Sequence, residues 1–222
     1  METHIYDSLV ANVRFFDMML LLTAILSLVF RRIRSQITSY SFQSFALSCI
    51  CFLVAYAKNS YHIYIAGALT FAIKCVIIPI FLKNVSNKTK ICKDTEKFLT
   101  VPTALIIAGI LIIFSHELML PVSSHLEPLT KGTLNTSVSL ILIGILLMIN
   151  RTYALTQVLG ILIIENGLFL AGISTTYGMP LIVELSAFFD IIVGVVVMGI
   201  LTNKINESFD TLDTNKLNLL KH

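Results

Sequence analysis

The chain has 222 residues, of which 56% are hydrophobic and only 13% carry a charge. Soluble globular domains carry about 25% charged residues, so the composition excludes an ordinary soluble domain. Runs of about 20 apolar residues are the length that an α-helix needs to cross a bilayer. The sequence therefore predicts an all-α integral membrane protein. The net charge of +3 is too small to indicate a nucleic-acid partner.

Seven apolar runs predict about seven transmembrane helices, at residues 9–30, 40–57, 61–82, 98–115, 136–149, 154–173 and 179–201. The N-terminus lacks the basic region of a signal peptide, so the first run is expected to remain as a helix. Pro79 is expected to bend the third helix near its end. The layout divides into four N-terminal helices with their loops (1–135), a three-helix module (136–202) and a polar tail (203–222), which either forms a short surface helix or frays.

The basic residues predict the orientation, because lysine and arginine concentrate in cytoplasmic loops. With the C-terminus in the cytoplasm, seven spans place the N-terminus outside. The outer segments then hold only Arg14, Lys58 and Lys131. The cytoplasmic segments hold Arg31, Arg32, Arg34, Lys83, Lys88, Lys90, Lys93, Lys97, Arg151, Lys204, Lys216 and Lys221.

Four ionisable residues inside the apolar runs are the candidate functional residues: Lys74, Glu165, Glu184 and Asp190. A charged side chain at the bilayer centre costs roughly 2.5–3.5 kcal/mol even on insertion scales, and such residues usually face a protein interior or a water-filled cavity. The three acids are staggered in depth, which suits a proton path, and Lys74 is their natural countercharge. A static ion pair that holds helices together is the alternative.

Other polar and small residues in the spans have simpler interpretations. Arg14 and Asp17 lie three residues apart in the first span, which predicts a local pair. Polar residues in and beside the sixth span either hold water or make hydrogen bonds between helices; they are Tyr153, Gln157 and Asn166. Glycines in the last two spans allow close helix approach; they are Gly160, Gly167, Gly172, Gly194 and Gly199.

The sequence indicates no cofactor of its own. The four cysteines form no Cys-x-x-Cys motif, so neither a disulfide framework nor a zinc or iron–sulfur site is predicted. None of the five histidines falls in the middle of a span, which argues against paired haem ligands.

The C-terminal part resembles the K subunit of respiratory complex I, a three-helix protein with one membrane glutamate in each of its last two helices. Glu165 matches the first of these, although its distance from Arg151 is longer than expected. Asp190, followed by Gly194, matches the second with aspartate in place of glutamate. Glu184 has no counterpart there. Over its whole length, the layout with four additional N-terminal helices and the run Glu165-Asn166-Gly167 more closely resembles component E of hydrogenase-4.

This resemblance implies a small, non-catalytic, proton-conducting subunit of a complex I-like group 4 hydrogenase in the bacterial inner membrane. Its implied partners are antiporter-like subunits, a membrane anchor subunit, a peripheral redox arm where the complex has one, and membrane lipid. By carry-over, Glu165 and Asp190 are proton-relay residues. Two alternatives stay open: a K-like subunit of a multi-subunit cation/proton antiporter, and a structural spacer.

Overall fold

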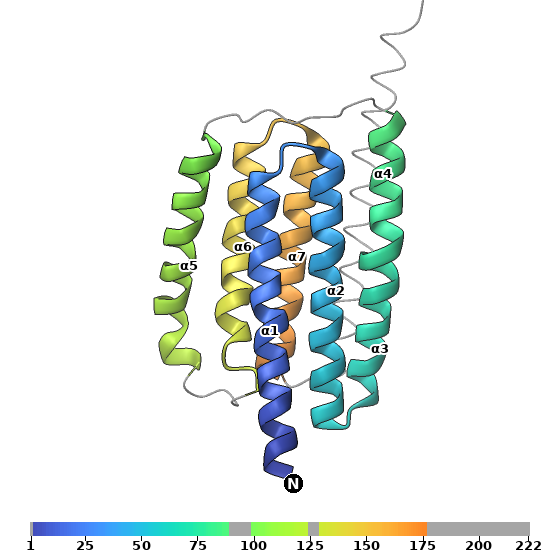
Figure 1. Cartoon of the computed structure of the whole chain (residues 1–222), viewed down its shortest axis with the longest axis vertical. Helices are drawn as coiled ribbons and strands as arrows, with labels where there is room; N and C mark the ends of the chain where they lie inside the picture. Colours follow the sequence, from blue (N-terminus) through green and yellow to red (C-terminus); the bar gives the residue numbers. More distant parts are fainter. Residues whose placement is uncertain (1, 89–98, 124–128, 177–222) are drawn as a thin grey trace, which may run out of the picture.

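The computed structural model describes residues 2–88, 99–123 and 129–176, and every element in these ranges is helical (Figure 1). Six helices are long and apolar enough to cross a membrane in this part of the chain. They are α1 (Glu2–Val29), α2 (Ile33–Lys58), the continuous run of α3 (Tyr61–Thr70), η1 (Phe71–Ile77) and α4 (Ile78–Lys88), then α5 (Val101–Ser123), α6 (Thr133–Asn150) and α7 (Ala154–Thr176). The all-α class is confirmed, and the chain is a multi-pass membrane protein. The predicted seventh span and the tail lie outside the described residues.

The helices α1, α2, α6 and α7 form the centre of the bundle. Helix α1 contacts α2 and α6, and α2 contacts α7. Helix α5 packs on one flank against α6 and α1, while the run from α3 to α4 packs on the opposite flank against α2 (Figure 1). The described helices of the predicted 136–202 module, α6 and α7, thus share one core with the N-terminal helices, and the division at residue 135 stays a prediction.

Helix α2 begins seven residues before the span predicted at residue 40, because its polar first turns are satisfied inside the bundle. The Gln36 side-chain amide donates to the carbonyl of Phe30 at 2.7 Å, and the Ser39 hydroxyl donates to the carbonyl of Thr23 at 2.8 Å. Hydrogen bonding removes most of the cost of burying such groups. Hydropathy alone does not detect this, because it scores the side chain without its partner.

Close packing of α6 on α7 depends on glycine, as predicted for Gly160 and Gly167. A Cβ atom on Gly160 would lie 2.9 Å from the Gly144 carbonyl oxygen, and one on Gly167 would lie 2.8 Å from the Ser137 carbonyl oxygen. Any side chain at these positions would push the two backbones apart. Glycine allows close approach of this kind between membrane helices.

The turn between α6 and α7 is tied to the rest of the bundle by two polar side chains. Arg151 is 1% exposed, and its Nη2 atom donates to the carbonyls of Leu28 at 2.7 Å and Phe30 at 3.0 Å. The last carbonyls of α1 are thereby satisfied by a cation, which the helix dipole also favours. The Asn150 amide makes two hydrogen bonds with the backbone of Leu99, before α5 begins.

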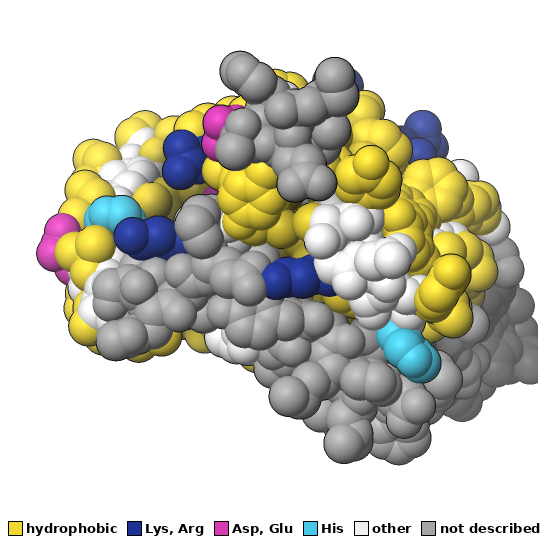
Figure 2. All heavy atoms as spheres, turned by 90° about the horizontal axis from the view of Figure 1, so that it is seen from below, with side chains coloured by type: hydrophobic (Ala, Val, Ile, Leu, Met, Phe, Trp, Pro, Cys, Tyr) yellow, Lys and Arg dark blue, Asp and Glu magenta, His cyan; other side chains and the backbone are white. Residues whose placement is uncertain are grey.

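The outer surface of the bundle is apolar, as a lipid environment requires. On α5, Ile106, Ile110 and Ile113 are each at least 60% exposed, and their spacing places them on one helix face. Seen from the end where α2 gives way to α3, hydrophobic side chains cover the flanks while lysine and arginine stand singly (Figure 2). Among the described residues, Arg14, Lys58 and Lys131 belong to the segments at this end.

Candidate functional site: a buried ion pair at mid-membrane depth

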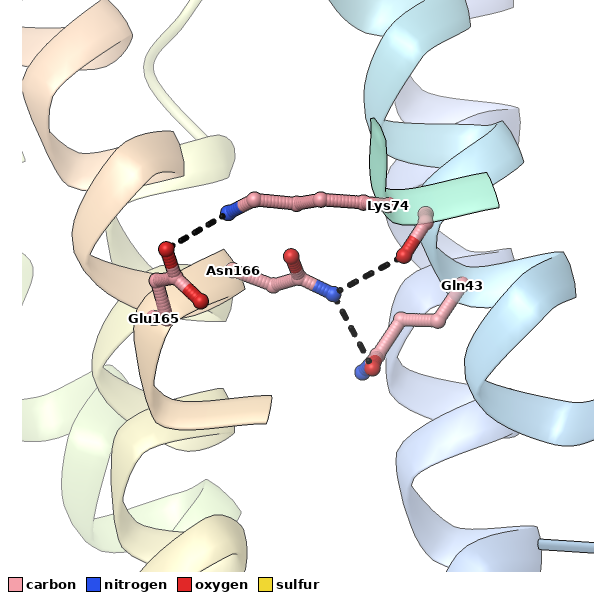
Figure 3. Close-up of polar contacts among 5 residues, drawn as sticks. Gln43, Lys74, Glu165 and Asn166 are labelled. Atoms are coloured by element: carbon pink, nitrogen blue, oxygen red, sulfur yellow. Dashed lines mark hydrogen bonds and ion pairs between the residues drawn. The ribbon is translucent and has the colours of Figure 1, made fainter. Parts of the chain in front are cut away.

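Lys74 and Glu165 form an ion pair in the middle of the bundle. The Lys74 Nζ atom lies 3.4 Å from the Glu165 Oε1 atom, and the two side chains are 0% and 4% exposed (Figure 3). Glu165 is at the midpoint of α7, about 16 Å from either end at the helical rise. Lys74 is likewise at the midpoint of the span Tyr61–Asn87. Both charges therefore lie near the centre of the hydrocarbon layer.

Lys74 extends from η1, a π-helical segment of seven residues between α3 and α4. π-Helical turns are rare and occur often at functional sites. Pro79 follows two residues after η1 and supplies a physical reason for it. Proline has no N–H to donate, and its ring clashes with the carbonyl four residues earlier, here that of Cys75. The regular hydrogen-bond ladder is therefore interrupted at this turn.

The position of Pro79 corrects one expectation from the sequence. Pro79 was predicted to bend the third span near its end. The span continues as helix to Lys88, so Pro79 lies farther from the end than expected, and the bend itself stays a prediction. The irregular segment precedes the proline and includes Lys74. Polar residues such as Asn87 remain helical beyond the apolar run, and Asn87 accepts a hydrogen bond from Arg34 of α2 at 2.9 Å.

An aromatic ring and three polar side chains surround the pair. Phe169, one turn after Glu165 on α7, places its ring centroid 5.5 Å from Lys74 Nζ, within the range of a cation–π contact. Asn166 directs its Nδ2 atom toward Gln43 Oε1 at 3.4 Å and Ser44 Oγ at 3.5 Å, both on α2 (Figure 3). The charged pair is thus bordered by a polar cluster that reaches a third helix.

The polar cluster has unused hydrogen-bonding capacity. Asn166 Oδ1 and Gln43 Nε2 are buried, and neither has a hydrogen-bond partner among the described residues. Almost all buried polar groups in proteins are paired, often with ordered water. Next to an ion pair, one acceptor and one donor of this kind can hydrogen-bond a water molecule or a proton-carrying group.

The structure brings together two of the four predicted functional residues. Glu165 and Lys74 meet as predicted, whereas Glu184 and Asp190 lie outside the described residues. The sequence interpretation missed Gln43, Ser44 and Phe169. A signal for two of them exists, because Gln43 and Ser44 are adjacent polar residues between Phe42 and Phe45. Phe169 has no such signal in a chain with 14 phenylalanines.

Asp17 does not form the local pair that the sequence predicted. Its Oδ2 atom accepts a hydrogen bond from Thr136 Oγ1 of α6 at 2.7 Å, and the residue is 9% exposed. Arg14 is exposed, and no ion pair joins it to Asp17 in the described structure. Asp17 faces the centre of the bundle while Arg14 faces outward, so the prediction of a local pair was wrong.

The chain is similar to two curated proteins over nearly its whole length. It is 27% identical over 204 residues to the uncharacterized protein Rv0085 of Mycobacterium tuberculosis, covering 91% of this chain and 92% of that protein. It is 24% identical over 204 residues to hydrogenase-4 component E of Escherichia coli strain K12, covering 91% of this chain and 94% of that protein. No family model and no solved structure matches the chain. The full-length resemblance to component E is therefore supported, and the K-subunit resemblance stays a prediction.

Proposed function

We propose that the chain is a membrane subunit of a hydrogenase-4-like complex and that it relays protons through Lys74 and Glu165. The observation that carries the proposal is the contact between these two residues at mid-membrane depth. The full-length similarity to hydrogenase-4 component E supports the assignment to such a complex. Glu184 and Asp190 are proposed as further members of the same relay.

The chemistry of the pair suits a relay. Burying two opposite charges in a low-dielectric interior costs several kcal/mol per ion before their attraction offsets it. Transfer of one proton from the ammonium to the carboxylate converts the charged pair into a neutral amine and a neutral acid. Because the neutral pair escapes the desolvation cost, the two states are closer in free energy here than in water. A pair with two accessible protonation states can take up a proton on one side and release it on the other.

The surroundings favour a relay over a static pair. A purely structural pair needs no polar neighbours beyond those that satisfy it, whereas Asn166 and Gln43 present spare hydrogen-bonding atoms beside it. Lys74 also belongs to a π-helical turn, a geometry that is frequent at functional sites. These features are consistent with a site whose charge state changes.

The proposed setting follows from the resemblance and the charge pattern. The chain lies in the bacterial inner membrane, with its N-terminus outside and its C-terminus in the cytoplasm. It contacts antiporter-like subunits, a membrane anchor subunit and, where the complex has one, a peripheral redox arm. The redox centres belong to other chains, so this chain is non-catalytic.

The proposal is tested on the complex extracted from native membranes in mild detergent and reconstituted into liposomes. We expect nickel, iron and antiporter-like subunits to accompany the chain. Replacing Glu165 with glutamine removes the ionisable group while keeping its shape. Because loss of one charge can destabilise a buried pair, the double variant K74M/E165Q is measured beside E165Q. We expect whichever of the two retains its metals and subunits to translocate at least tenfold fewer protons per hydrogen molecule turned over. The measurement is dye-monitored proton uptake against hydrogen turnover.

Glu117→Gln is the matched control, because Glu117 is an exposed glutamate near the end of α5. It should leave the proton-to-hydrogen ratio unchanged. If the E165Q complex assembles and its ratio of protons to hydrogen molecules is unaltered, the pair has only a structural role. Antiporter-like subunits without nickel and iron would instead assign the chain to a cation/proton antiporter.

A further inference from the structure

A groove on the surface of the bundle runs between α1 and α2, toward the turn that joins them. Its volume is about 510 Å³. Helix α1 contributes Met19, Leu22 and Leu26, and α2 contributes Arg34, Thr38 and Phe42. We refer to this feature as the α1–α2 groove. It is distinct from the Lys74–Glu165 site, since neither of those residues lines it.

The α1–α2 groove is suited to hydrocarbon along most of its length. Apart from Arg34 its large side chains are apolar, and the hydroxyls of Thr23, Thr38 and Ser39 are already hydrogen-bonded. The Thr23 hydroxyl donates within α1, and the Ser39 hydroxyl donates to the Thr23 carbonyl. The lining along α1 and the residue that follows it extends from Met19 to Phe30, about 16 Å at the helical rise. This is about half of the 30 Å hydrocarbon core, the depth of a single leaflet.

One end of the groove carries positive charge at the membrane boundary. Arg34 lines this end and is exposed, and Arg32 is exposed in the adjoining turn. The Arg34 Nη2 atom donates to Asn87, and a guanidinium has five N–H donors in all. Such donors bind phosphate oxygens strongly, often two at a time.

The start of α2 adds to this attraction. Arg32 is the N-cap residue of α2 and makes no side-chain capping bond, and the first turn of α2 has no acidic residue. The positive end of the helix dipole is therefore not offset by a side chain there, and helix N-termini favour phosphate. The apolar length and the basic end together match an amphipathic anion whose charge sits at headgroup level.

We propose that the α1–α2 groove binds an anionic phospholipid, with one acyl chain along α1 and α2 and the phosphate on Arg34. A wholly apolar transmembrane helix from another subunit would leave the exposed Arg34 at the headgroup end of the groove without an anionic partner. Basic pockets between membrane helices are known binding sites for anionic headgroups.

The test uses the full chain purified in mild detergent and titrated with phosphatidylglycerol or phosphatidylcholine, with bound lipid counted by native mass spectrometry. We expect Arg34→Gln to weaken phosphatidylglycerol binding about fivefold, the contribution of one basic residue near the headgroups. Phosphatidylcholine binding should stay unchanged. Leu26→Trp fills the groove and should weaken binding of both lipids. Thr38→Trp, from the opposite wall, serves the same purpose if L26W fails to fold.

Arg14→Gln is the matched control, because Arg14 is an exposed arginine on α1 that lies outside the groove. It should bind both lipids like the wild type. Equal phosphatidylglycerol affinities of R34Q and R14Q would overturn the phosphate site. Unchanged lipid binding in the tryptophan variants would overturn the groove itself. A photo-crosslinker at Leu22 that captures a protein subunit in native membranes, and no lipid, would also overturn the proposal.

Discussion

At the residue scale, the pairing of Lys74 with Glu165 determines what each can do. Lys74 is fully buried and Glu165 nearly so. Each charge is therefore stabilised by the other in place of water that burial has removed. Phe169 adds a cation–π contact on the side of the lysine. Such an arrangement tolerates loss of both charges far better than loss of one.

We predict a strongly non-additive double-mutant cycle at this pair. Lys74→Met removes the cation from a buried ion pair and should destabilise the chain by about 3–5 kcal/mol. Adding Glu165→Gln removes the opposite charge as well and should restore most of that stability. The measurement is thermal unfolding of the full chain in mild detergent. Additive effects of the two substitutions would mean that the residues do not depend on each other.

The candidate residues were partly predictable because charge in an apolar run is conspicuous. Glu165 and Lys74 stand out on hydropathy alone. To predict that they pair, one also needs the depth of each residue in the membrane, which the predicted span bounds give approximately. Asp17 shows where this reasoning stops. Its partner, Thr136, is 119 residues away, and a local spacing rule instead selected Arg14, which points outward.

At the scale of the helices, glycine determines how closely α6 and α7 approach. Gly144 and Gly160 face each other so closely that the carbonyl oxygen of each lies 2.9 Å from a Cβ built on the other. The close approach holds α7, and with it Glu165, against the centre of the bundle. Gly109 on α5 is different, because a Cβ there would meet nothing within 4 Å.

We predict that Gly160→Ala destabilises the chain whereas Gly109→Ala does not. The added methyl group at residue 160 forces a backbone shift in a packed interface, which typically costs about 1–3 kcal/mol. At residue 109 the same change adds helix propensity, worth up to about 1 kcal/mol. Thermal unfolding of the two variants side by side measures both. Equal effects of the two substitutions on thermal unfolding would show that the packing of α6 on α7 does not depend on glycine at residue 160.

The helices themselves were more predictable than their ends. Apolar length located all six described spans, since that signal is intrinsic to the sequence. The start of α2 was missed because Gln36 and Ser39 are buried on α1 carbonyls. The η1 segment was missed because Pro79 marks an irregularity without specifying a π-helical turn.

At the scale of the whole molecule, the distribution of charge predicts how the bundle sits in the membrane. The end where α1 gives way to α2 carries Arg31, Arg32 and Arg34. Among the described residues, the opposite end carries Lys131, before α6, together with Arg14 and Lys58, and its basic side chains stand apart from one another (Figure 2). Cytoplasmic loops are enriched in lysine and arginine, so the arginine-rich end is expected to face the cytoplasm.

We predict that single cysteines at the two ends react from opposite sides of the membrane. Arg31 and Lys131 are both exposed. With the four native cysteines replaced by alanine, Lys131→Cys should react with a membrane-impermeant maleimide in intact cells. Arg31→Cys should react only in inverted vesicles. Labelling in the reverse pattern would place the N-terminus in the cytoplasm and overturn the orientation.

The contact of Arg151 with the end of α1 bears on the order in which the chain is made. The donor and the Leu28 carbonyl that it satisfies are 123 residues apart. A ribosome adds about 5–20 residues per second, so α1 waits several seconds for this partner after its own synthesis. During that interval its terminal carbonyls stay at the aqueous boundary. Helix α1 can therefore reach its final position in the bundle only after the turn before α7 has left the ribosome. Completion of the bundle is thus a late event in biogenesis.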